Sequence, residues 1–364
     1  MGNHDRDSLL SMSRTIPIAL PLRQTIGAFT RFIGRCTALC LILMTTPACG
    51  LVVDAVQSVW PIATNELDAI CARGRVRVGM AVEPFRPFVF PAIYTDEGVR
   101  ITGLDVAILQ AIAAALSDRC GGDAPVVPHL KLVRFRDLFV ELNEGKLDFF
   151  ISAKTMNVVS PVEAGLAYSI PYYYDGGVIG IAKQSVASGI NKQLHGKRAE
   201  QDLDAFKSAL NGLRLGVQTV RSPHHYAKAN LPHSQLILCD SLPAAFESHD
   251  PPIDVILGKR PILEQMVKSG YKDWEVLKDD SGVPWLLTRE HYAIVLAEDD
   301  HTLRWFINDL LFRMEQDGRL ARLRHRWLDE TYAYPRRAAA EGLPFDANKM
   351  PQHYDQGGCR AELR

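Results

Sequence analysis

Small polar and basic residues follow a short apolar strand near the middle of the chain. Ser152, Lys154 and Thr155 come directly after the apolar run 149–151, which itself follows a helix end. In α/β proteins, ligand sites form at the carboxyl ends of strands, where exposed polar residues follow the strand. We therefore expect this stretch to line a binding site rather than to belong to the core.

Two further basic residues follow apolar strand patterns. Arg221 comes shortly after the run 213–218, and Lys259 comes after the run 253–257. Together with Lys154 they could form a cleft that favours a carboxylate or another small acid. The alternative is that Lys259 and Arg221 point to solvent, as charged side chains usually do.

The sequence offers little for independent catalysis. Ser152 and Lys154 lack the SxxK spacing, and no GxSxG, P-loop or GxGxxG motif is present. A lyase would need a general acid over a leaving hydroxyl, for which Glu83, Lys154 and Lys259 are the candidates. No CxxC or Cys/His spacing suggests zinc. We expect no enzyme, no metal and no organic cofactor.

Alternating strand and helix patterns must position these residues. A first series has strands at 75–80, 130–134 and 149–151 with helices at 106–116 and 137–143, the signature of a parallel α/β sheet. A second series has strands at 213–218, 235–239 and 253–257. The similar apolar strands 178–182 and 292–296 can carry the chain between the two series, and helices at 302–317 and 320–328 close the fold.

This order predicts two α/β lobes. The first lobe comprises residues 65–182 and 297–334, and the second comprises residues 183–296 with the crossing strands. Residues 335–364 are polar without apolar periodicity, so we expect a loosely ordered tail.

The N-terminal region predicts export. Arginines precede the apolar run 38–44, and Thr46-Pro47-Ala48 fits a cleavage site directly before Cys49. Residues 1–48 are therefore expected to be a signal peptide, followed by a flexible linker at 49–64. Ala-Cys-Gly also resembles the end of a lipobox, although Thr46 stands where Leu is preferred, so lipid attachment at Cys49 stays open. The net charge of −1 weighs against a nucleic-acid partner.

Seven cysteines are present, of which Cys36 and Cys40 would leave with the signal peptide. In an oxidising periplasm the remaining cysteines can pair. Cys71 precedes the first strand and Cys120 ends the first long helix, so these two could meet. Sequence alone does not establish the connectivity.

Between residues 67 and 328 the chain resembles the family 3 periplasmic solute-binding proteins of the amino-acid-binding type. The order and spacing of several segments carry the resemblance: ARGRVRVGM, TGLDVAILQAIAAAL, GKLDFFIS, YSIPYYYDGG, LRLGVQ, IDVILG and HYAIVLAEDD. It implies a two-lobed periplasmic-binding-protein-like (type II) fold with two hinge-crossing strands. Such a protein closes over a small solute and delivers it to the membrane permease of an ABC transporter.

The resemblance also assigns ligand-binding positions. Phe85 stands where the family stacks an aromatic ring on the ligand, or else packs in the core. Ala153 and Thr155 match first-lobe positions that bind the ligand carboxylate. Ser222 matches the second-lobe Thr/Ser at a helix N-terminus, where N-capping is the equally simple interpretation.

Two departures from the family pattern change the expected ligand. The family's arginine, which binds the α-carboxylate, belongs a few residues after Asn157, where this chain has Val158 to Pro161. The family's second-lobe aspartate, which binds the ammonium, is replaced by Lys259. Because an ammonium facing a lysine would be repelled, we expect a small anionic solute rather than a standard amino acid.

Three functions remain open. The first is a monomeric transport binding protein, and the second is a dehydratase-like lyase on the same scaffold. The third is an accessory or sensor protein of a periplasmic dehydrogenase.

Overall fold

The computed structural model describes residues 65–81, 86–96, 98–156, 165–219, 221–330, 341–349 and 357–362. These residues belong to the compact unit Ala63–Arg364. The expected signal peptide, Cys49, Glu83, Phe85 and the segment after Asn157 lie outside the described residues. Among the helices that the structure describes, none combines the length and apolar character needed to cross a bilayer.

The first lobe is built on a five-stranded sheet with strand order β4-β1-β5-β12-β6. β1 pairs in parallel with β4 and β5, whereas β12 pairs antiparallel with β5 and β6. The strands are β1 (Arg75–Ala81), β4 (Val127–Val133), β5 (Phe149–Thr155), β6 (Leu166–Tyr168) and β12 (Tyr292–Ala297).

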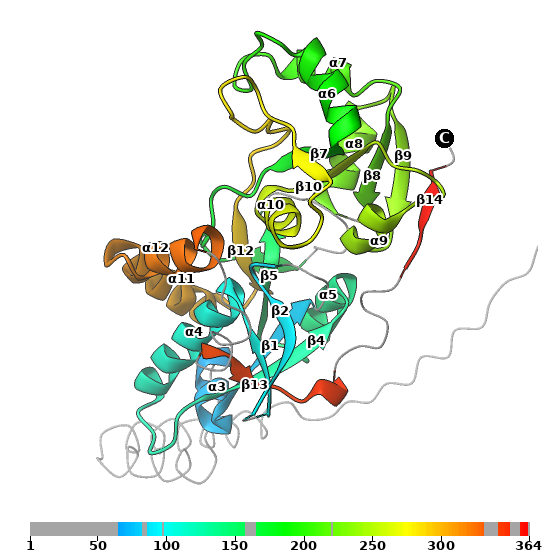
Figure 1. The fold of residues 1–364 in the computed structure, drawn as a ribbon. Helices are drawn as coiled ribbons and strands as arrows, with labels where there is room; N and C mark the ends of the chain where they lie inside the picture. Colours follow the sequence, from blue (N-terminus) through cyan, green and yellow to red (C-terminus); the bar gives the residue numbers. More distant parts are fainter. Residues whose placement is uncertain are drawn as a thin grey trace, which may run out of the picture. The chain divides into compact units, whose positions relative to one another are not determined.

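Helices cover both faces of this sheet. Figure 1 shows α4, α11 and α12 on one side of the strands and α5 on the other. The helices of this lobe are α3 (Glu66–Arg73), α4 (Leu104–Cys120), α5 (Phe135–Asn143), α11 (His301–Gln316), α12 (Arg319–Arg324) and the π-helical turn η2 (His325–Asp329). Gly103 directly precedes α4, and its φ of 134° and close approach to the Phe88 carbonyl oxygen leave no room for a side chain.

The second lobe is built on a six-stranded sheet with strand order β11-β7-β10-β8-β9-β14. β8 pairs in parallel with β9 and β10, and β7 is antiparallel to β10. The elements are β7 (Val178–Lys183), α6 (Gln184–Gln193), α7 (Leu203–Ala209), β8 (Arg214–Gln218), α8 (Ser222–Asn230), β9 (Gln235–Cys239), α9 (Leu242–Glu247), β10 (Val255–Lys259), α10 (Arg260–Ser269), β11 (Trp274–Val276) and β14 (Cys359–Ala361).

The chain crosses between the lobes twice, in segments that hydrogen-bond to each other. The amide of Gly176 donates to the carbonyl oxygen of Glu290 at 3.0 Å, and Tyr292 N donates to Tyr173 O at 2.8 Å. The predicted crossing strands exist as β7 and β12, but β7 belongs to the second sheet and β12 to the first. The crossings are therefore the residues just before each strand, and the lobe boundaries at 182 and 297 move to these segments.

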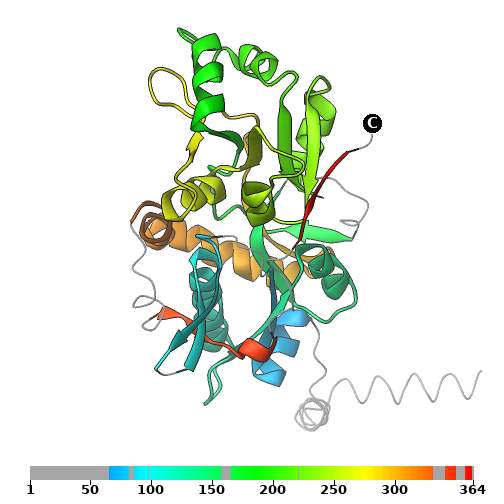
Figure 2. The ribbon, with the colours of Figure 1, turned by 45° about the vertical axis from the view of Figure 1, so that its right-hand side comes forward.

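The chain after residue 335 differs from the expected loose tail. β13 (Leu343–Pro344) joins β3 (Gly98–Thr102) and β2 (Phe90–Thr95) in a small sheet, and the short helix η3 (Ala347–Lys349) follows. β14 extends the second sheet along β9, as Figure 2 shows in dark red. Backbone pairing, which needs no apolar periodicity, orders these polar residues.

Two disulfides connect the four cysteines that the structure describes. Cys71–Cys120 joins the ends of α3 and α4, the pair that the sequence analysis considered. Cys239–Cys359 ties β14 to β9 and closes a separation of 120 residues. The second bond thus fastens the C-terminal strand covalently to the second lobe.

Replacing Cys359 with serine should lower the free energy of unfolding by about 2–4 kcal/mol, because a cross-link over a long loop restricts the unfolded chain. Urea unfolding under oxidising conditions measures the change. With reductant present, the variant and the unaltered protein should unfold at the same urea concentration. Equal unfolding midpoints without reductant would contradict a stabilising role for this disulfide.

Candidate ligand-binding site

The carboxyl end of β5 meets the carboxyl end of β10 at the junction of the lobes. β5 extends further than predicted: Ser152, Lys154 and Thr155 continue the strand and are buried, not exposed. Lys259 ends β10, and its Nζ donates a hydrogen bond to the carbonyl oxygen of Ala153. This bond links the second sheet directly to the first.

The three basic side chains are all buried. Lys154 is 3 % exposed, Arg221 is 7 % exposed and Lys259 is 8 % exposed, so the solvent-facing alternative for Arg221 and Lys259 does not apply. The Arg221 guanidinium lies over the Phe135 ring of the first lobe, 3.3 Å from its centroid. Lys154 Nζ donates to the Thr155 carbonyl oxygen at 2.7 Å and faces the Tyr168 ring. Arg221 and Lys259 therefore extend from the second lobe towards the first, whereas Lys154 packs within the first.

A buried carboxylate that the sequence analysis missed joins the two predicted hydroxyl groups. Glu290 lies on the return crossing segment and is 5 % exposed. Its Oε2 accepts hydrogen bonds from Thr155 Oγ1 at 2.5 Å and from Ser222 Oγ at 3.0 Å, and its Oε1 accepts from Thr288 Oγ1 at 3.0 Å. Thr155 and Ser222 are thus brought together by an internal partner. The only sequence signal was the position of this acidic residue two places before the expected crossing strand 292–296.

Burial dominates the electrostatics of Lys259. Removal from water lowers its pKa from the usual 10.5 to about 7; Glu290 and Asp105 oppose this shift, whereas Arg221 and Lys154 reinforce it. The ammonium also lies 4.3 Å from the centroid of the Tyr292 ring, a cation–π contact. A further anion near Lys259 would stabilise its charged form.

A second buried group supports the same strand end. The backbone N–H of Ala153 donates to Asp105 Oδ2 at 3.0 Å and to the Tyr172 hydroxyl oxygen at 3.1 Å. Burial raises the pKa of Asp105 to about 7, although its bonds to Tyr172 and Ala153 and the charge of Lys259 act in the opposite direction. Ala153 has a φ of 43°, a left-handed conformation that non-glycine residues rarely adopt. Its N–H, the backbone donor expected to bind the ligand carboxylate, and its carbonyl oxygen are both used within the protein.

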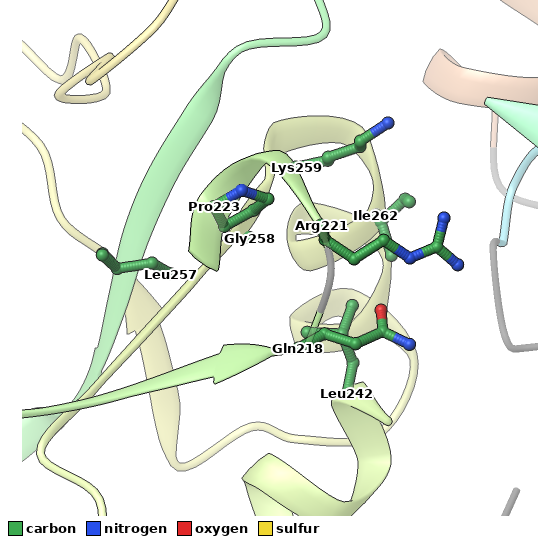
Figure 3. A pocket seen from close by; sticks show the side chains of 8 residues that line it. All are labelled: Gln218, Arg221, Pro223, Leu242, Leu257, Gly258, Lys259 and Ile262. Atoms are coloured by element: carbon green, nitrogen blue, oxygen red, sulfur yellow. The ribbon is translucent and has the colours of Figure 1, made fainter. Parts of the chain in front are cut away.

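A pocket opens in the second lobe beside these groups (Figure 3). It lies at the carboxyl ends of β8 and β10 and the first turns of α8, α9 and α10, and it is partly open to solvent. The side chains of Gln218, Arg221 and Lys259 extend to the same side, and apolar residues form the rest of the wall. The lining residues are Gln218, Arg221, Pro223, Leu242, Leu257, Gly258, Lys259 and Ile262.

The charged and polar groups of this pocket lie on one side of an apolar wall. Two buried cations and an amide surround a largely apolar pocket, the pattern of sites that orient small molecules with a few polar groups. Within the described ranges, no group of three or more His, Cys, Asp or Glu side chains could hold a metal ion. The pocket uses Gln218, which the sequence analysis did not single out.

The fold and the site define a class, the two-lobed binding proteins that hold a small molecule where their lobes meet. Residues 76–330 match the family described as bacterial extracellular solute-binding proteins, family 3. The chain belongs to this family, and its fold is the predicted two-lobed α/β fold.

Solved structures with the same fold are amino-acid-binding proteins. An amino acid ABC transporter substrate-binding protein from Streptococcus pneumoniae, bound to L-arginine, is 19% identical with a TM-score of 0.56 and covers 72% of this chain and 98% of its own. A mutant of ArgBP from T. maritima is 22% identical with a TM-score of 0.54, covering 72% and 99%.

The ancestral amino acid-binding protein AncCDT-1, described as a precursor of cyclohexadienyl dehydratase, is 21% identical with a TM-score of 0.55, covering 73% and 100%. At these identities the likeness concerns the fold. A search of curated protein sequences finds no significant match.

Proposed function

We propose that this protein captures a small anionic solute in the periplasm and delivers it to an ABC transporter. The observation that carries the proposal is the buried Lys259, whose pKa of about 7 means that its surroundings compensate its charge incompletely. Arg221 adds a second buried cation on the same pocket wall. An acid group that bound beside them would add negative charge next to both side chains.

The same residues disfavour an α-amino acid as the solute. The ligand's ammonium would lie near Lys259 and Arg221, and like charges repel strongly where water is excluded. The carboxyl group of Asp105 is already bonded to Ala153 and Tyr172 and has a pKa raised to about 7. The pocket therefore provides better binding partners for an acidic ligand group than for an amine.

Delivery to a permease and export through the predicted signal peptide follow from the family. Two of the similar structures are described as binding proteins of amino acid ABC transporters. Among the residues nominated as a general acid, Lys259 bonds to Ala153 and Lys154 bonds to Thr155. These bonds favour a binding protein over a lyase. We propose in addition that the protein acts as a monomer without a cofactor.

A thermal-shift screen tests the solute class. Small carboxylic acids without an amine should raise the melting temperature more than amino acids do, since a ligand at a hundred times its dissociation constant stabilises by about 2.7 kcal/mol. A large shift with glutamine or arginine, and none with any acid, would reject the proposal.

A further inference from the structure

The protein places one of its own carboxylates at the junction of its lobes. Glu290 accepts hydrogen bonds from Thr155 at the end of β5 in the first lobe and from Ser222 at the start of α8 in the second lobe. It is also the first of the charges that favour the charged form of Lys259. One carboxylate thus contacts hydroxyl donors from both lobes and neutralises part of the charge of the buried lysine.

We propose that Glu290 is an internal ligand: its side chain occupies the donors that an acidic solute needs, and the solute binds by displacing it. The inference rests on the proposed function in one respect, namely that the external ligand is an acid. It adds that the empty site is self-occupied and that Glu290 sets the affinity.

Competition follows from the geometry and from charge. Thr155 and Ser222 donate to the same oxygen, Glu290 Oε2, so a second carboxylate has no room to use both hydroxyls while Glu290 stays. Two carboxylates side by side in a buried site would also repel each other. Exchange of one for the other keeps the charge beside Lys259 constant, which makes displacement the less costly route.

The position of Glu290 couples this exchange to the hinge. Its backbone carbonyl accepts from Gly176 N at 3.0 Å on the opposite crossing segment, and its side chain is held by Thr288 two residues earlier. With Glu290 bound, the hydroxyls of both lobes are connected in the absence of solute. A solute that takes those hydroxyls releases Glu290 and makes the interlobe bonds itself.

Chemical rescue tests the internal ligand directly. Glu290→Ala removes the carboxylate and leaves a space that acetate can fill between the hydroxyls of Thr155 and Ser222. Acetate should raise the melting temperature of this variant by several degrees and should leave the unaltered protein unchanged. Acetamide and sodium chloride at the same concentrations control for shape and ionic strength. Glu298→Ala, a change just beyond the other end of β12, is the matched control and should not respond.

A second variant keeps the test decisive if Glu290→Ala does not fold. Glu290→Gln preserves the size of the side chain but removes its charge, so it competes less well for the donors. Small acids should bind it at least about tenfold more tightly than they bind the unaltered protein, because a like charge next to the site is gone. Equal or weaker binding to Glu290→Gln, or an acetate response shared by all variants, would overturn the inference.

The inference and the proposed function can fail separately. If the unaltered protein binds no acid but Glu290→Ala responds to acetate, the internal carboxylate stands and the proposed solute class is rejected. If the unaltered protein binds small acids and both Glu290 variants bind them no more tightly, the proposed function stands and the internal ligand is rejected.

Discussion

Replacing Lys259 with methionine should weaken the binding of small acids by about 10- to 100-fold. Hydrogen bonds to charged groups contribute about 1.5–3 kcal/mol, and each 1.4 kcal/mol corresponds to a factor of about ten in affinity. Methionine keeps the length and the apolar stem of the side chain, so the pocket wall retains its shape. Isothermal titration calorimetry with the best acid from the screen measures the loss.

The pH dependence separates a binding role for Lys259 from a structural one. Because the pKa of Lys259 is lowered to about 7, the free protein loses the ammonium as pH rises through this value. Acid affinity should therefore fall between about pH 6 and about pH 8.5 in the unaltered protein and stay level in Lys259→Met. The neighbouring groups that act on Lys259 are Glu290, Arg221, Lys154 and Asp105.

The matched control is Lys268→Met, an exposed lysine in the last turn of α10, the helix that Lys259 precedes. This change should leave both the affinity and its pH profile intact. Acid binding that is equally strong in Lys259→Met would place the Lys259 ammonium outside the binding site.

Replacing Asp105 with asparagine should remove a pH-dependent contribution of a few kcal/mol to the free energy of unfolding. The pKa of Asp105 is 3.8 in the unfolded chain and about 7 when folded, and a pKa difference of one between the two states corresponds to about 1.4 kcal/mol. Between these values the folded protein holds a proton that the unfolded chain releases. The stabilising contribution of Asp105 to the free energy of unfolding is therefore fully present below about pH 3.8 and is lost as pH rises through about 7.

Asparagine stays neutral at every pH and can still accept from Ala153 and Tyr172. The variant should gain stability relative to the unaltered protein as pH rises from about 4.5 to about 7.5, measured by urea unfolding. Asp118→Asn, an exposed change on the same helix α4, serves as the control and should show no such trend. Parallel stability curves for Asp105→Asn and the unaltered protein would mean that Asp105 is ionised in the fold.

Much of the fold could be predicted because its strands and helices are strongly patterned. The predicted strand 75–80 became β1 at Arg75–Ala81, and the predicted helix 106–116 lies within α4 at Leu104–Cys120. Segments without such a pattern were missed. β14 is exposed or half-buried along its length, and its place is set by backbone pairing to β9 and by the Cys239–Cys359 bond.

The site was only partly predictable, because some of its residues carry no local sequence pattern. Lys259 and Arg221 could be nominated because they follow apolar strands, and the family likeness indicated Thr155 and Ser222. Glu290 could not be nominated, since its partners Thr155 and Ser222 are 135 and 68 residues away in the chain. Likewise, nothing in the local sequence indicates that Asp105 on α4 bonds to Ala153 on β5.

The sequence by itself determined the two α/β series, the family and the basic character of the strand ends, because local apolar periodicity and residue type carry that information. Only the tertiary structure decided that the lysines are buried and that an internal glutamate satisfies the expected ligand donors. Burial and charge pairing arise from groups far apart in the chain, and their energies depend on distance and on the exclusion of water.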